Sequence, residues 1–394
     1  MKFPPGLPID DIKFLCSILA KKGESRLVGG CVRNILLSKT STDIDIATQV
    51  EPKQAMQLLT KEGVKCIPTG IKHGTFTVIY HKQHYEITTL RRDVETFGRH
   101  AEVAFTNDWL EDAKRRDFTM NAMYIDMDGN LYDYFKGQQD LAQKLIRFVG
   151  DPEARIHEDY LRILRYFRFY SYFDGNNMDD ASLNACKKLA ANMDKLSGER
   201  IQLEMFKIIN AKFAMDALAL MHKNSILKVL GLDIQSDGFW GYNLGDDSIV
   251  NLAALLRCCA KPADTLAYIK LRWKLANKTF ALLDFLVHLP FTANDAKQHQ
   301  LRLLYQHGLE KYLGGVKLLA AETTALPADE LISRATNAVI PKFPLSGDDM
   351  LKIGYSGKAM GVAIKLLEKA WLESDFKLSK SSLLAQAKHK LNKF

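Results

Sequence analysis

The stretch Ser41-Thr42-Asp43-Ile44-Asp45-Ile46-Ala47 alternates two aspartates with two isoleucines. Along a β-strand successive side chains point to opposite faces, so Asp43 and Asp45 are expected on one face and the isoleucines in a core. Two neighbouring carboxylates repel each other unless a cation lies between them. Oxygen ligands at this spacing suit Mg²⁺, which completes its shell with water and substrate phosphates. The pattern predicts a metal-binding strand, although a bare Asp-x-Asp is more often a solvated strand face.

A glycine turn lies about a dozen residues upstream of the two aspartates. Gly29 and Gly30 follow the short apolar run Arg26-Leu27-Val28. The apolar-periodic stretch Val32 to Leu37 comes next, so the glycines are expected to join a strand to a helix. Glycine lets backbone N–H groups approach a phosphate, the helix N-terminus adds positive potential, and Arg33 offers a fork of donors. With the aspartates, the turn predicts a nucleotidyl-transfer site.

The composition is typical of a large globular protein. The chain has 394 residues, of which 47% are hydrophobic, enough for a sizeable core and for more than one domain. Its net charge of +8 and its pI of about 9.0 favour a polyanionic partner. Nothing in the sequence predicts a membrane span, and no protein partner can be inferred.

The cysteines indicate neither a zinc site nor a disulfide framework. No two of them form a CxxC pair, and no His/Cys ligand spacing occurs. A reducing compartment is the simplest interpretation. The first residues, Met1 to Asp11, show neither a long apolar segment nor an Arg-rich amphipathic leader, so we expect a cytoplasmic location. The six cysteines are Cys16, Cys31, Cys66, Cys186, Cys258 and Cys259.

The pattern of the chain changes near Asp140. Upstream of it, short β-rich runs alternate with helical segments such as Pro52 to Lys61. From Asp140 onward, periodic apolar spacing predicts helices almost throughout. We therefore expect an α+β protein with a compact α/β head and an all-helical remainder. The β-rich runs are Leu27-Val28, Thr75 to Tyr80, Tyr85 to Leu90 and Met123 to Asp126.

Three motifs in this order resemble the class II tRNA nucleotidyltransferases, the CCA-adding enzymes. The ordered match extends from about residue 26 to residue 210. The resemblance implies a nucleotidyltransferase head of the polymerase β type with a mixed sheet, followed by an elongated all-helical neck, body and tail. The motifs are Gly29-Gly30-Cys31-Val32-Arg33 with Asp43-Ile44-Asp45, then Arg115-Arg116-Asp117-Phe118-Thr119-Met120-Asn121-Ala122-Met123, then Glu158-Asp159-Tyr160-Leu161-Arg162-Ile163-Leu164-Arg165.

The same resemblance implies three domains with different functions along the chain. It places a catalytic head over residues 1–138, a helical neck with nucleotide-base recognition over 139–210, and a helical body and tail that binds tRNA over 211–394. The implied reaction is the addition of C, C and A to the 3′ end of tRNA from CTP and ATP, without a nucleic-acid template.

A third carboxylate would help to hold metal ions or to activate the 3′-hydroxyl of the RNA. Glu86 begins the β-rich run Glu86-Ile87-Thr88-Thr89-Leu90, which can lie beside the Asp43/Asp45 strand. We therefore take Asp43, Asp45 and Glu86 as catalytic, and the two aspartates as ligands of Mg²⁺. In a two-metal scheme, one ion lowers the pKa of the attacking hydroxyl and the other stabilises the departing pyrophosphate, at a separation of roughly 3.5–4 Å.

Arg116 and Asp117 follow a segment, Trp109 to Arg115, that is predicted to be helical. In the family this arginine contacts the incoming nucleotide and this aspartate helps to read the ribose, and the resemblance gives Arg116 and Asp117 those roles. The alternative is a surface charge pair that contacts nothing.

Asp159 and Arg162 are expected to choose the base. A spacing of three on a helix would place both on one face. CTP and ATP share an exocyclic amino donor beside a ring-nitrogen acceptor, which a carboxylate and a guanidinium match. GTP and UTP present the opposite pattern, and a polar mismatch of this kind discriminates by factors of roughly 10⁴ or more in favourable cases.

Two further arginines continue this stripe. Arg165 and Arg168 follow Arg162 at intervals of three, with apolar residues between them. Such a stripe is usually a solvated helix face. Because it begins at the base-reading pair, we expect these arginines to contact nucleotide phosphates, together with Gly29, Gly30 and Arg33. Upstream, Asp151-Pro152-Glu153 is predicted to start a helix.

Other segments carry weaker expectations. The polar stretch between Arg91 and Phe105 resembles the family's flexible loop and favours complete CCA addition, although Phe97 replaces a common acidic residue. Asn34 replaces the usual aspartate and loses a charge pairing with a nearby arginine. The segment Ser197 to Glu204 resembles a helix that supports the base-reading helix. Basic residues that could meet the tRNA backbone are Arg272, Lys274, Lys278, Lys358, Lys377, Lys380, Lys388, Lys390 and Lys393.

Three alternatives remain open on the sequence. A bacterial poly(A) polymerase shares the head and neck, but Thr69-Gly70-Ile71-Lys72-His73-Gly74-Thr75 resembles the CCA-adding form. An enzyme that adds only A, after a partner has added CC, would look the same. A catalytically inactive RNA-binding protein belongs to another class, and the intact Asp43, Asp45, Asp159 and Arg162 oppose it.

Overall fold

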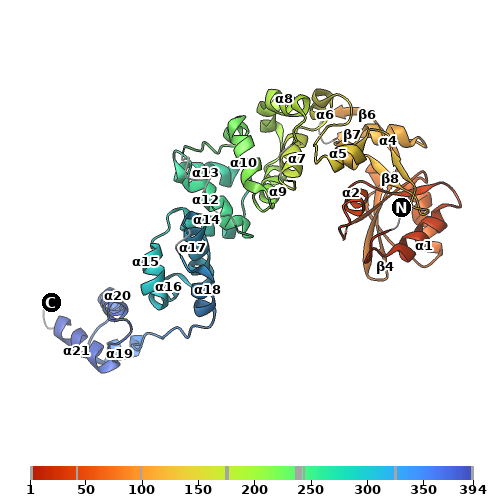
Figure 1. The fold of residues 1–394 in the computed structure, drawn as a ribbon. Helices are drawn as coiled ribbons and strands as arrows, with labels where there is room; N and C mark the ends of the chain where they lie inside the picture. Colours follow the sequence, from red (N-terminus) through yellow and green to blue (C-terminus); the bar gives the residue numbers. More distant parts are fainter. Residues whose placement is uncertain are drawn as a thin grey trace. The chain divides into compact units, whose positions relative to one another are not determined.

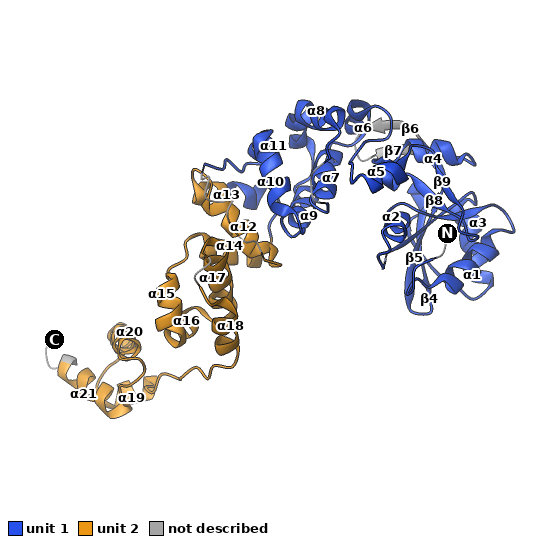
Figure 2. Cartoon of the chain, viewed as in Figure 1, with its two compact units in different colours: residues 1–235, 267–275 blue, residues 236–266, 276–394 orange. Residues whose placement is uncertain are grey.

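The computed structural model describes residues 3–40, 43–97, 100–173, 177–235, 242, 245–323 and 326–391, with the backbone alone for 93–103 and 390–391. It divides into two compact units (Figures 1 and 2). Unit 1 comprises Met1–Gln235 and Ala267–Leu275, and unit 2 comprises Ser236–Leu266 and Ala276–Phe394. The expected boundaries of head, neck and body are finer than this division and stay a prediction.

Unit 1 begins with a mixed β-sheet. Its described strands number seven, in the order β3-β4-β5-β2-β1-β8-β9. Of these pairings β2–β5 is parallel and the others are antiparallel, so the predicted mixed sheet is confirmed. The strands are β1 (Ser25–Val28), β2 (Ile44–Thr48), β3 (Lys65–Gly70), β4 (Thr75–Tyr80), β5 (Gln83–Thr89), β8 (Met123–Ile125) and β9 (Leu131–Asp133).

The centre of this sheet is apolar, and short helices accompany it. Leu27, Ile46 and Ile87, on three adjacent strands, are fully buried. This burial explains why the β-rich runs form strands, since β-branched and aliphatic side chains pack well on a pleated surface. The accompanying helices are α1 (Ile9–Leu19), α2 (Gly30–Leu36), α3 (Pro52–Lys61), α4 (Trp109–Lys114) and α5 (Gly137–Ala142), with the 3₁₀ turns η1 (Ile71–His73) and η2 (Thr119–Asn121).

The stretch expected as a flexible loop is a β-hairpin. Strands β6 (Arg91–Phe97) and β7 (His100–Phe105) pair antiparallel, with an irregularity between Asp93 and Glu95. Backbone hydrogen bonds between the two strands explain how so polar a stretch adopts regular structure. The side chain of Phe97 lies outside the described part of the chain, so the effect of that departure stays untested.

The rest of unit 1 is helical, as predicted. Asp151 accepts hydrogen bonds from the backbone N–H groups of Glu153 and Ala154, and Pro152 occupies the first turn, which confirms the expected helix start. Helix α7 packs on α9, and its Ile163 and Phe167 are buried. The helices are α6 (Pro152–Glu158), α7 (Leu161–Tyr170), α8 (Asp180–Leu189), α9 (Gly198–Ile209), α10 (Ala214–Lys223) and α11 (Ile226–Val229), with the 3₁₀ helix η3 (Ala190–Lys195).

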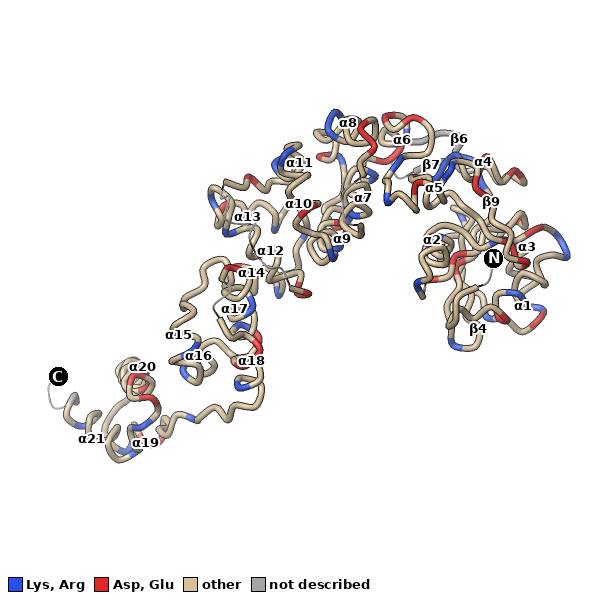
Figure 3. The backbone as a smooth tube through the Cα atoms, in the orientation of Figure 1, with Lys and Arg blue, Asp and Glu red and all other residues tan. Residues whose placement is uncertain are grey.

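Unit 2 consists of helices in its described part. One apolar cluster centres on Tyr312, Val316 and Leu331, and a second on Leu367 and Trp371. No described helix is long and apolar enough to cross a bilayer. Lys and Arg are distributed over both units (Figure 3). The helices are α12 (Ser248–Arg257), α14 (Asn277–Val287), α15 (Ala293–Gln298), α16 (Gln300–His307), α17 (Leu309–Glu322), α18 (Ala328–Thr336), α19 (Gly347–Lys352), α20 (Gly357–Glu373) and α21 (Lys380–Leu391), while α13 (Pro262–Arg272) is divided between the units.

Candidate active site

The glycine turn joins β1 to α2, as the sequence predicts. Gly29 has a φ of +71°, in the left-handed region that glycine tolerates best. A Cβ placed on Gly29 would lie 3.4 Å from Nη1 of Arg116 and 3.8 Å from Oδ2 of Asp45. The backbone of this turn is therefore in close contact with both a cationic and an anionic side chain of the site.

The two aspartates face away from the core, as predicted. Ile44 and Ile46 are 1% and 0% exposed, whereas Asp43 is exposed and Asp45 is partly buried. Strand β2 begins at Ile44, so Asp43 directly precedes the paired region. Asp45 stands opposite Glu86 in the parallel register of β2 and β5, which confirms that the Glu86 strand lies beside the aspartates.

The carboxylates create a local excess of negative charge. Burial and the neighbouring Glu86 and Asp43 raise the pKa of Asp45 while Arg116 and Arg33 oppose the shift, and together they bring it to about 6. A carboxylate with a raised pKa is costly to ionise, and a cation beside it removes that cost. Within the described ranges no three His, Cys, Asp or Glu side chains converge on a single ion. The carboxylates of Asp43 and Asp45, both in the lining of one cleft, fit Mg²⁺, which needs few protein ligands.

A cleft of about 450 Å³ contains most of the predicted site residues. It brings together Gly29, Gly30, Arg33, Asp43, Asp45, Arg116, Asp117, Arg165 and Arg168. Glu86, Asp159 and Arg162 are not part of its lining. The cleft thus joins the glycine turn, the acids of the sheet and the arginines of α7 within unit 1.

Four lining residues were missed by the sequence analysis: Asn121, Phe169, Tyr172 and Lys207. For the first three, the sequence contained a pattern that could have identified them. Asn121 lies in the second motif, and Phe169 and Tyr172 follow Arg165 at intervals of four and seven, which is one face of a helix. No sequence pattern pointed to Lys207, because it lies on α9 and reaches the cleft through the packing of α9 on α7.

Arg116 is held by a buried carboxylate that the sequence analysis did not single out. Oδ2 of Asp112 accepts hydrogen bonds from Nη2 of Arg116 at 2.9 Å and from the hydroxyl of Tyr124 at 2.7 Å. Nη2 of Arg115 lies 2.6 Å from Oδ1 of the same carboxylate. Burial alone would raise the pKa of Asp112, but the two arginines hold it well below its usual range. Arg116 is therefore a cation held in place at the cleft, and the alternative interpretation, a surface charge pair that contacts nothing, is wrong.

Asp117 is also buried and paired. Its Oδ2 accepts from Nε and Nη2 of Arg165 at 2.7 and 2.5 Å, and its Oδ1 accepts from Nδ2 of Asn121 at 3.1 Å. Burial opposes ionisation, but Arg165, Asn121 and Arg162 lower the pKa of Asp117 to about 2. Arg165, expected to bind phosphate alone, therefore also fixes this aspartate.

Arg33 reaches across the cleft. Its Nη1 donates to Oδ1 of Asn121 at 2.8 Å, and its Nη2 donates to Oδ1 of Asn34 at 3.3 Å. Burial lowers the pKa of Arg33, and Asp117 partly offsets this. Asn34 thus keeps a hydrogen bond to the arginine, although it carries no charge.

Asp159 and Arg162 do not share a helix, so the predicted spacing argument is wrong. Helix α6 ends at Glu158, and Asp159 is extended, with a φ of −155°. Its Oδ1 accepts from the backbone N–H of Leu161 at 3.1 Å, which explains the break, because the carboxylate satisfies a free donor at the start of α7. Arg162 lies in the first turn of α7.

Both members of the expected base-reading pair are engaged within the protein. Oδ2 of Asp159 accepts from Nη2 of Arg200 at 2.6 Å. Nη1 of Arg162 lies 2.5 Å from Oε2 of Glu158, and its Nη2 donates to the carbonyl of Arg115 at 3.0 Å. That carbonyl directly precedes Arg116 in the chain, so Arg162 is linked to the residues that line the cleft.

Helix α9 supports α7, as the sequence analysis expected. Nη1 of Arg168 donates to Oε1 of Glu204 at 3.0 Å, and both side chains are buried. One of the basic residues that could meet tRNA makes contacts within the protein: Arg272 donates through both Nη atoms to the carbonyls of Met193, Asp194 and Leu196. Its guanidinium caps the end of η3 and contributes to unit 1 rather than to an open basic surface.

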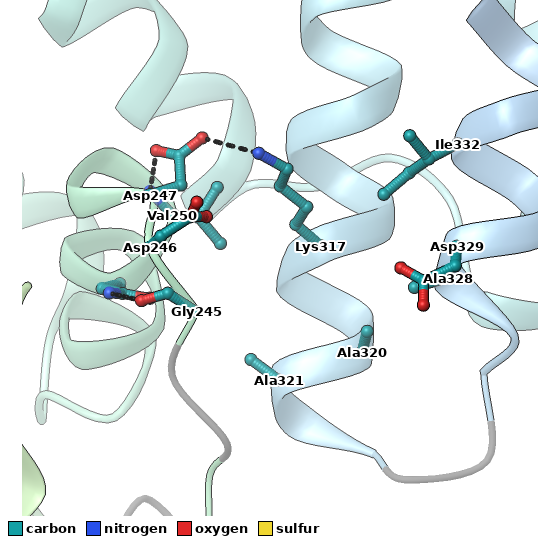
Figure 4. Close-up of a pocket in the computed structure, with 11 residues that line it drawn as sticks. Gly245, Asp246, Asp247, Val250, Lys317, Ala320, Ala321, Ala328, Asp329 and Ile332 are labelled. Carbon is teal, nitrogen blue, oxygen red and sulfur yellow. Dashed lines mark hydrogen bonds and ion pairs between the residues drawn. The ribbon is translucent and has the colours of Figure 1, made fainter. Parts of the chain in front are cut away.

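A second cavity, in unit 2, has a different chemical character (Figure 4). It measures about 290 Å³ and is lined mainly by small apolar side chains and three aspartates. Nζ of Lys317 lies 3.3 Å from Oδ2 of Asp247, so these two charges neutralise each other. No arginine belongs to this lining as the structure describes it. We therefore place the candidate active site in the cleft of unit 1.

Comparison with known proteins agrees with this placement. Residues 25–147 match the family model described as the poly A polymerase head domain. Residues 176–235 match the model described as the probable RNA and SrmB-binding site of polymerase A. Both matched segments fall in unit 1, and the first contains the aspartates, the glycine turn and Arg116.

Relatives and solved structures extend the likeness to the whole chain. CCA tRNA nucleotidyltransferase 1, mitochondrial, of Danio rerio is 37% identical, over 92% of this chain and 86% of that protein. The CCA-adding enzyme of Geobacillus sp. (strain WCH70) is 31% identical over 89% of each. The structure of the Bacillus stearothermophilus CCA-adding enzyme in complex with CTP has a TM-score of 0.81 and 26% identity, covering 100% of this chain and 99% of that one. The chain therefore belongs to the CCA tRNA nucleotidyltransferases, the CCA-adding enzymes.

Proposed function

We propose that the cleft of unit 1 carries out the reaction of this family, the addition of C, C and A to the 3′ end of tRNA. The 3′-hydroxyl oxygen of the RNA attacks the α-phosphorus of CTP or ATP, the bond to the β-phosphate oxygen breaks, and pyrophosphate leaves. The observation that carries the proposal is the position of Asp43 and Asp45 in one cleft with the glycine turn and four arginines. This arrangement supplies acids for a cation and donors for a triphosphate.

The acids are proposed to prepare the attacking group. Asp43 and Asp45 would hold Mg²⁺, with Glu86 beside Asp45 to add negative charge or to take up a proton. A divalent ion bound there would lower the pKa of the RNA hydroxyl and neutralise charge on the departing pyrophosphate. Strands β2 and β5 would hold these carboxylates beside the α-phosphate of the bound nucleotide.

The cations are proposed to hold the triphosphate. Arg33, Arg116 and Arg168 are positioned by Asn121, Asp112 and Glu204, so little reorganisation is needed when a polyanion binds. Asp117, which is acceptor-only when ionised, is suited to a ribose hydroxyl. Gly30, at the start of α2, would contribute its backbone N–H beside these arginines, whereas the N–H of Gly29 donates to the carbonyl of Met123.

The base is proposed to be selected by Asp159 and Arg162. A carboxylate accepts from the exocyclic amino group of C or A, and a guanidinium donates to the adjacent ring nitrogen. The pair stands outside the cleft lining, but Nη2 of Arg162 donates to the carbonyl of Arg115, which directly precedes Arg116 of that lining. This hydrogen bond supports a base site continuous with the phosphate site.

The test offers single nucleotides with Mg²⁺ to purified protein and tRNA ending at the discriminator base, at CC, or at CCA. We expect two CMP and one AMP to be added, after which addition stops. A long A tail would identify a poly(A) polymerase. AMP addition to CC ends without CMP addition would identify an A-adding specialist, and no transfer at all would contradict the proposal.

We propose that the protein acts in a reducing compartment of the cell. Burial raises the pKa of the Cys16 and Cys31 thiols to about 12, which keeps them protonated and unreactive. In the described part of the chain no cysteine belongs to a disulfide, which suits a reducing compartment such as the cytoplasm. Relatives named mitochondrial make fractionation of cells that express the protein the deciding measurement.

A further inference from the structure

Helix α9 presents two opposite charges, one to Asp159 in the break between α6 and α7 and the other to Arg168 on α7. Arg200 is paired with Asp159, and Glu204, four residues later, is paired with Arg168. Residues four apart lie on one face of a helix. A single rigid element therefore holds both a carboxylate expected to read the base and an arginine that lines the cleft.

The carboxylate of Asp159 is fixed at both of its oxygens. Oδ1 accepts from the backbone of Leu161, and Oδ2 accepts from Arg200 at 2.6 Å. A hydrogen bond from a guanidinium to a carboxylate is strong and directional, so Arg200 on one oxygen and the Leu161 backbone on the other together fix the orientation of this group. An ionised carboxylate offers about four acceptor positions, which leaves capacity for an amino group of a base.

We propose that Arg200 is a positioning residue for base selection, which acts by holding Asp159 as an oriented hydrogen-bond acceptor. The inference rests on the proposed base-reading role of Asp159. A carboxylate free to rotate can turn away from the base or pair with another cation, and then it no longer penalises the carbonyl of U or G. Discrimination depends on the geometry of such polar groups, whereas phosphate contacts are shared by all four nucleotides.

The test measures kcat/KM for CTP and for UTP on tRNA that ends at the discriminator base, and for ATP and GTP on tRNA that ends at CC. Arg200→Met is expected to lower the C-over-U and A-over-G ratios about tenfold or more, because small displacements of a reading group have effects of this size. Arg200→Lys, which keeps the charge without the planar fork, is expected to restore part of each ratio.

Glu204→Gln is the matched control, since it lies on the same face of α9 and loosens Arg168 instead. It is expected to raise KM by one common factor for all four nucleotides and to leave both ratios unchanged. A loss of base selectivity in Glu204→Gln equal to that in Arg200→Met would show that α9 acts only as a scaffold, and would overturn the inference.

A double-mutant comparison tests whether Arg200 acts through Asp159. Adding Arg200→Met to Asp159→Asn is expected to leave the ratios where Asp159→Asn alone puts them, because the two changes remove one function. If Asp159→Asn lowers the ratios and Arg200→Met does not, the inference falls and the proposed function stands. If Asp159→Asn leaves the ratios at the wild-type value, both the base-reading role and this inference fall.

Discussion

At the scale of single residues, the site depends on charges that the fold keeps close together. Asp45 lies beside Glu86 and Asp43, and burial and these neighbours raise its pKa to about 6. When it is ionised, Asp45 lowers the free energy of unfolding of the metal-free protein, because folding brings like charges together and away from water. The arrangement makes chemical sense if a cation binds there during the reaction.

Asp45→Asn is therefore expected to stabilise the metal-free protein at pH 8 while it abolishes nucleotide transfer. The native pKa of Asp45 exceeds its unfolded value, so the wild type loses stability as the pH rises through about 6. The difference in Tm between variant and wild type in EDTA should be larger at pH 8 than at pH 5. A variant that is less stable than the wild type at pH 8 would contradict this electrostatic account.

Asp112 offers a second test at this scale. Asp112→Asn is expected to raise KM for both CTP and ATP about tenfold, because Arg116 loses the carboxylate that fixes it. Removing one partner of a buried ion pair also costs about 3–5 kcal/mol, so Tm is measured beside the kinetics. The comparison variant is Tyr124→Phe, which removes a hydroxyl that donates to Asp112 and accepts from Nε of Arg116 at 3.2 Å, but keeps both ion pairs of Asp112. It is expected to raise KM less than Asp112→Asn does, and a wild-type KM in Asp112→Asn would show that Asp112 has no part in nucleotide binding.

At the scale of secondary-structure elements, close backbone contacts lock the helices of unit 1 together. A Cβ on Gly198, the first residue of α9, would lie 2.1 Å from the carbonyl oxygen of Arg272. Arg272 in turn donates to three carbonyls near the end of η3. The position of α9, and with it Arg200 and Glu204, depends on the absence of a side chain at residue 198.

Gly198→Ala is expected to destabilise unit 1 by about 1–3 kcal/mol, the usual range for overpacking. Gly361→Ala, inside α20 with open space around it, is expected to be neutral or to stabilise by roughly 0.5–1 kcal/mol. Thermal unfolding followed by circular dichroism compares the two variants. Similar shifts in Tm would mean that the contact at Gly198 does not constrain α9.

Some elements followed directly from the sequence and others did not. The strand–turn–helix around Gly29 and the alternation of Asp43, Ile44, Asp45 and Ile46 were predictable because they rest on local periodicity and backbone conformation. The break at Asp159 was missed because a side-chain cap competes with helix continuation there. Periodicity does not report such caps.

At the scale of the whole molecule, periodicity predicted an α/β head and a helical remainder, because strand and helix periods differ, while the mixed sheet was implied by the family resemblance. Periodicity could not predict which distant residues meet. Asp112 pairs with Arg115 and Arg116, which follow it by three and four residues. Its ability to hold Arg116 depends on its burial beside Tyr124, which is distant in the sequence. Lys207 enters the cleft solely through the packing of α9 on α7. Long-range packing decides these contacts, and no local pattern records them.

The net charge of +8 makes a further prediction at this scale. Binding of tRNA should weaken strongly with salt, because each phosphate that a Lys or Arg neutralises releases counterions. The logarithm of the association constant should fall linearly with the logarithm of the salt concentration between 50 and 200 mM, a range chosen from the general behaviour of such complexes. Filter binding of labelled tRNA measures the slope, and an affinity independent of salt would argue against a phosphate-contacting surface.

The central claim is that Asp43 and Asp45 serve a divalent cation that drives transfer to an RNA 3′ end. The most direct measurement is single-turnover addition of CMP to tRNA lacking CCA, with Mg²⁺ titrated, for the wild type, Asp43→Asn and Asp45→Asn. We predict that transfer by the wild type saturates with Mg²⁺ and that each amide variant loses at least about a hundredfold in rate, an effect of several kcal/mol on the barrier. Either variant turning over at the wild-type rate, at the same Mg²⁺ concentration, would contradict the account.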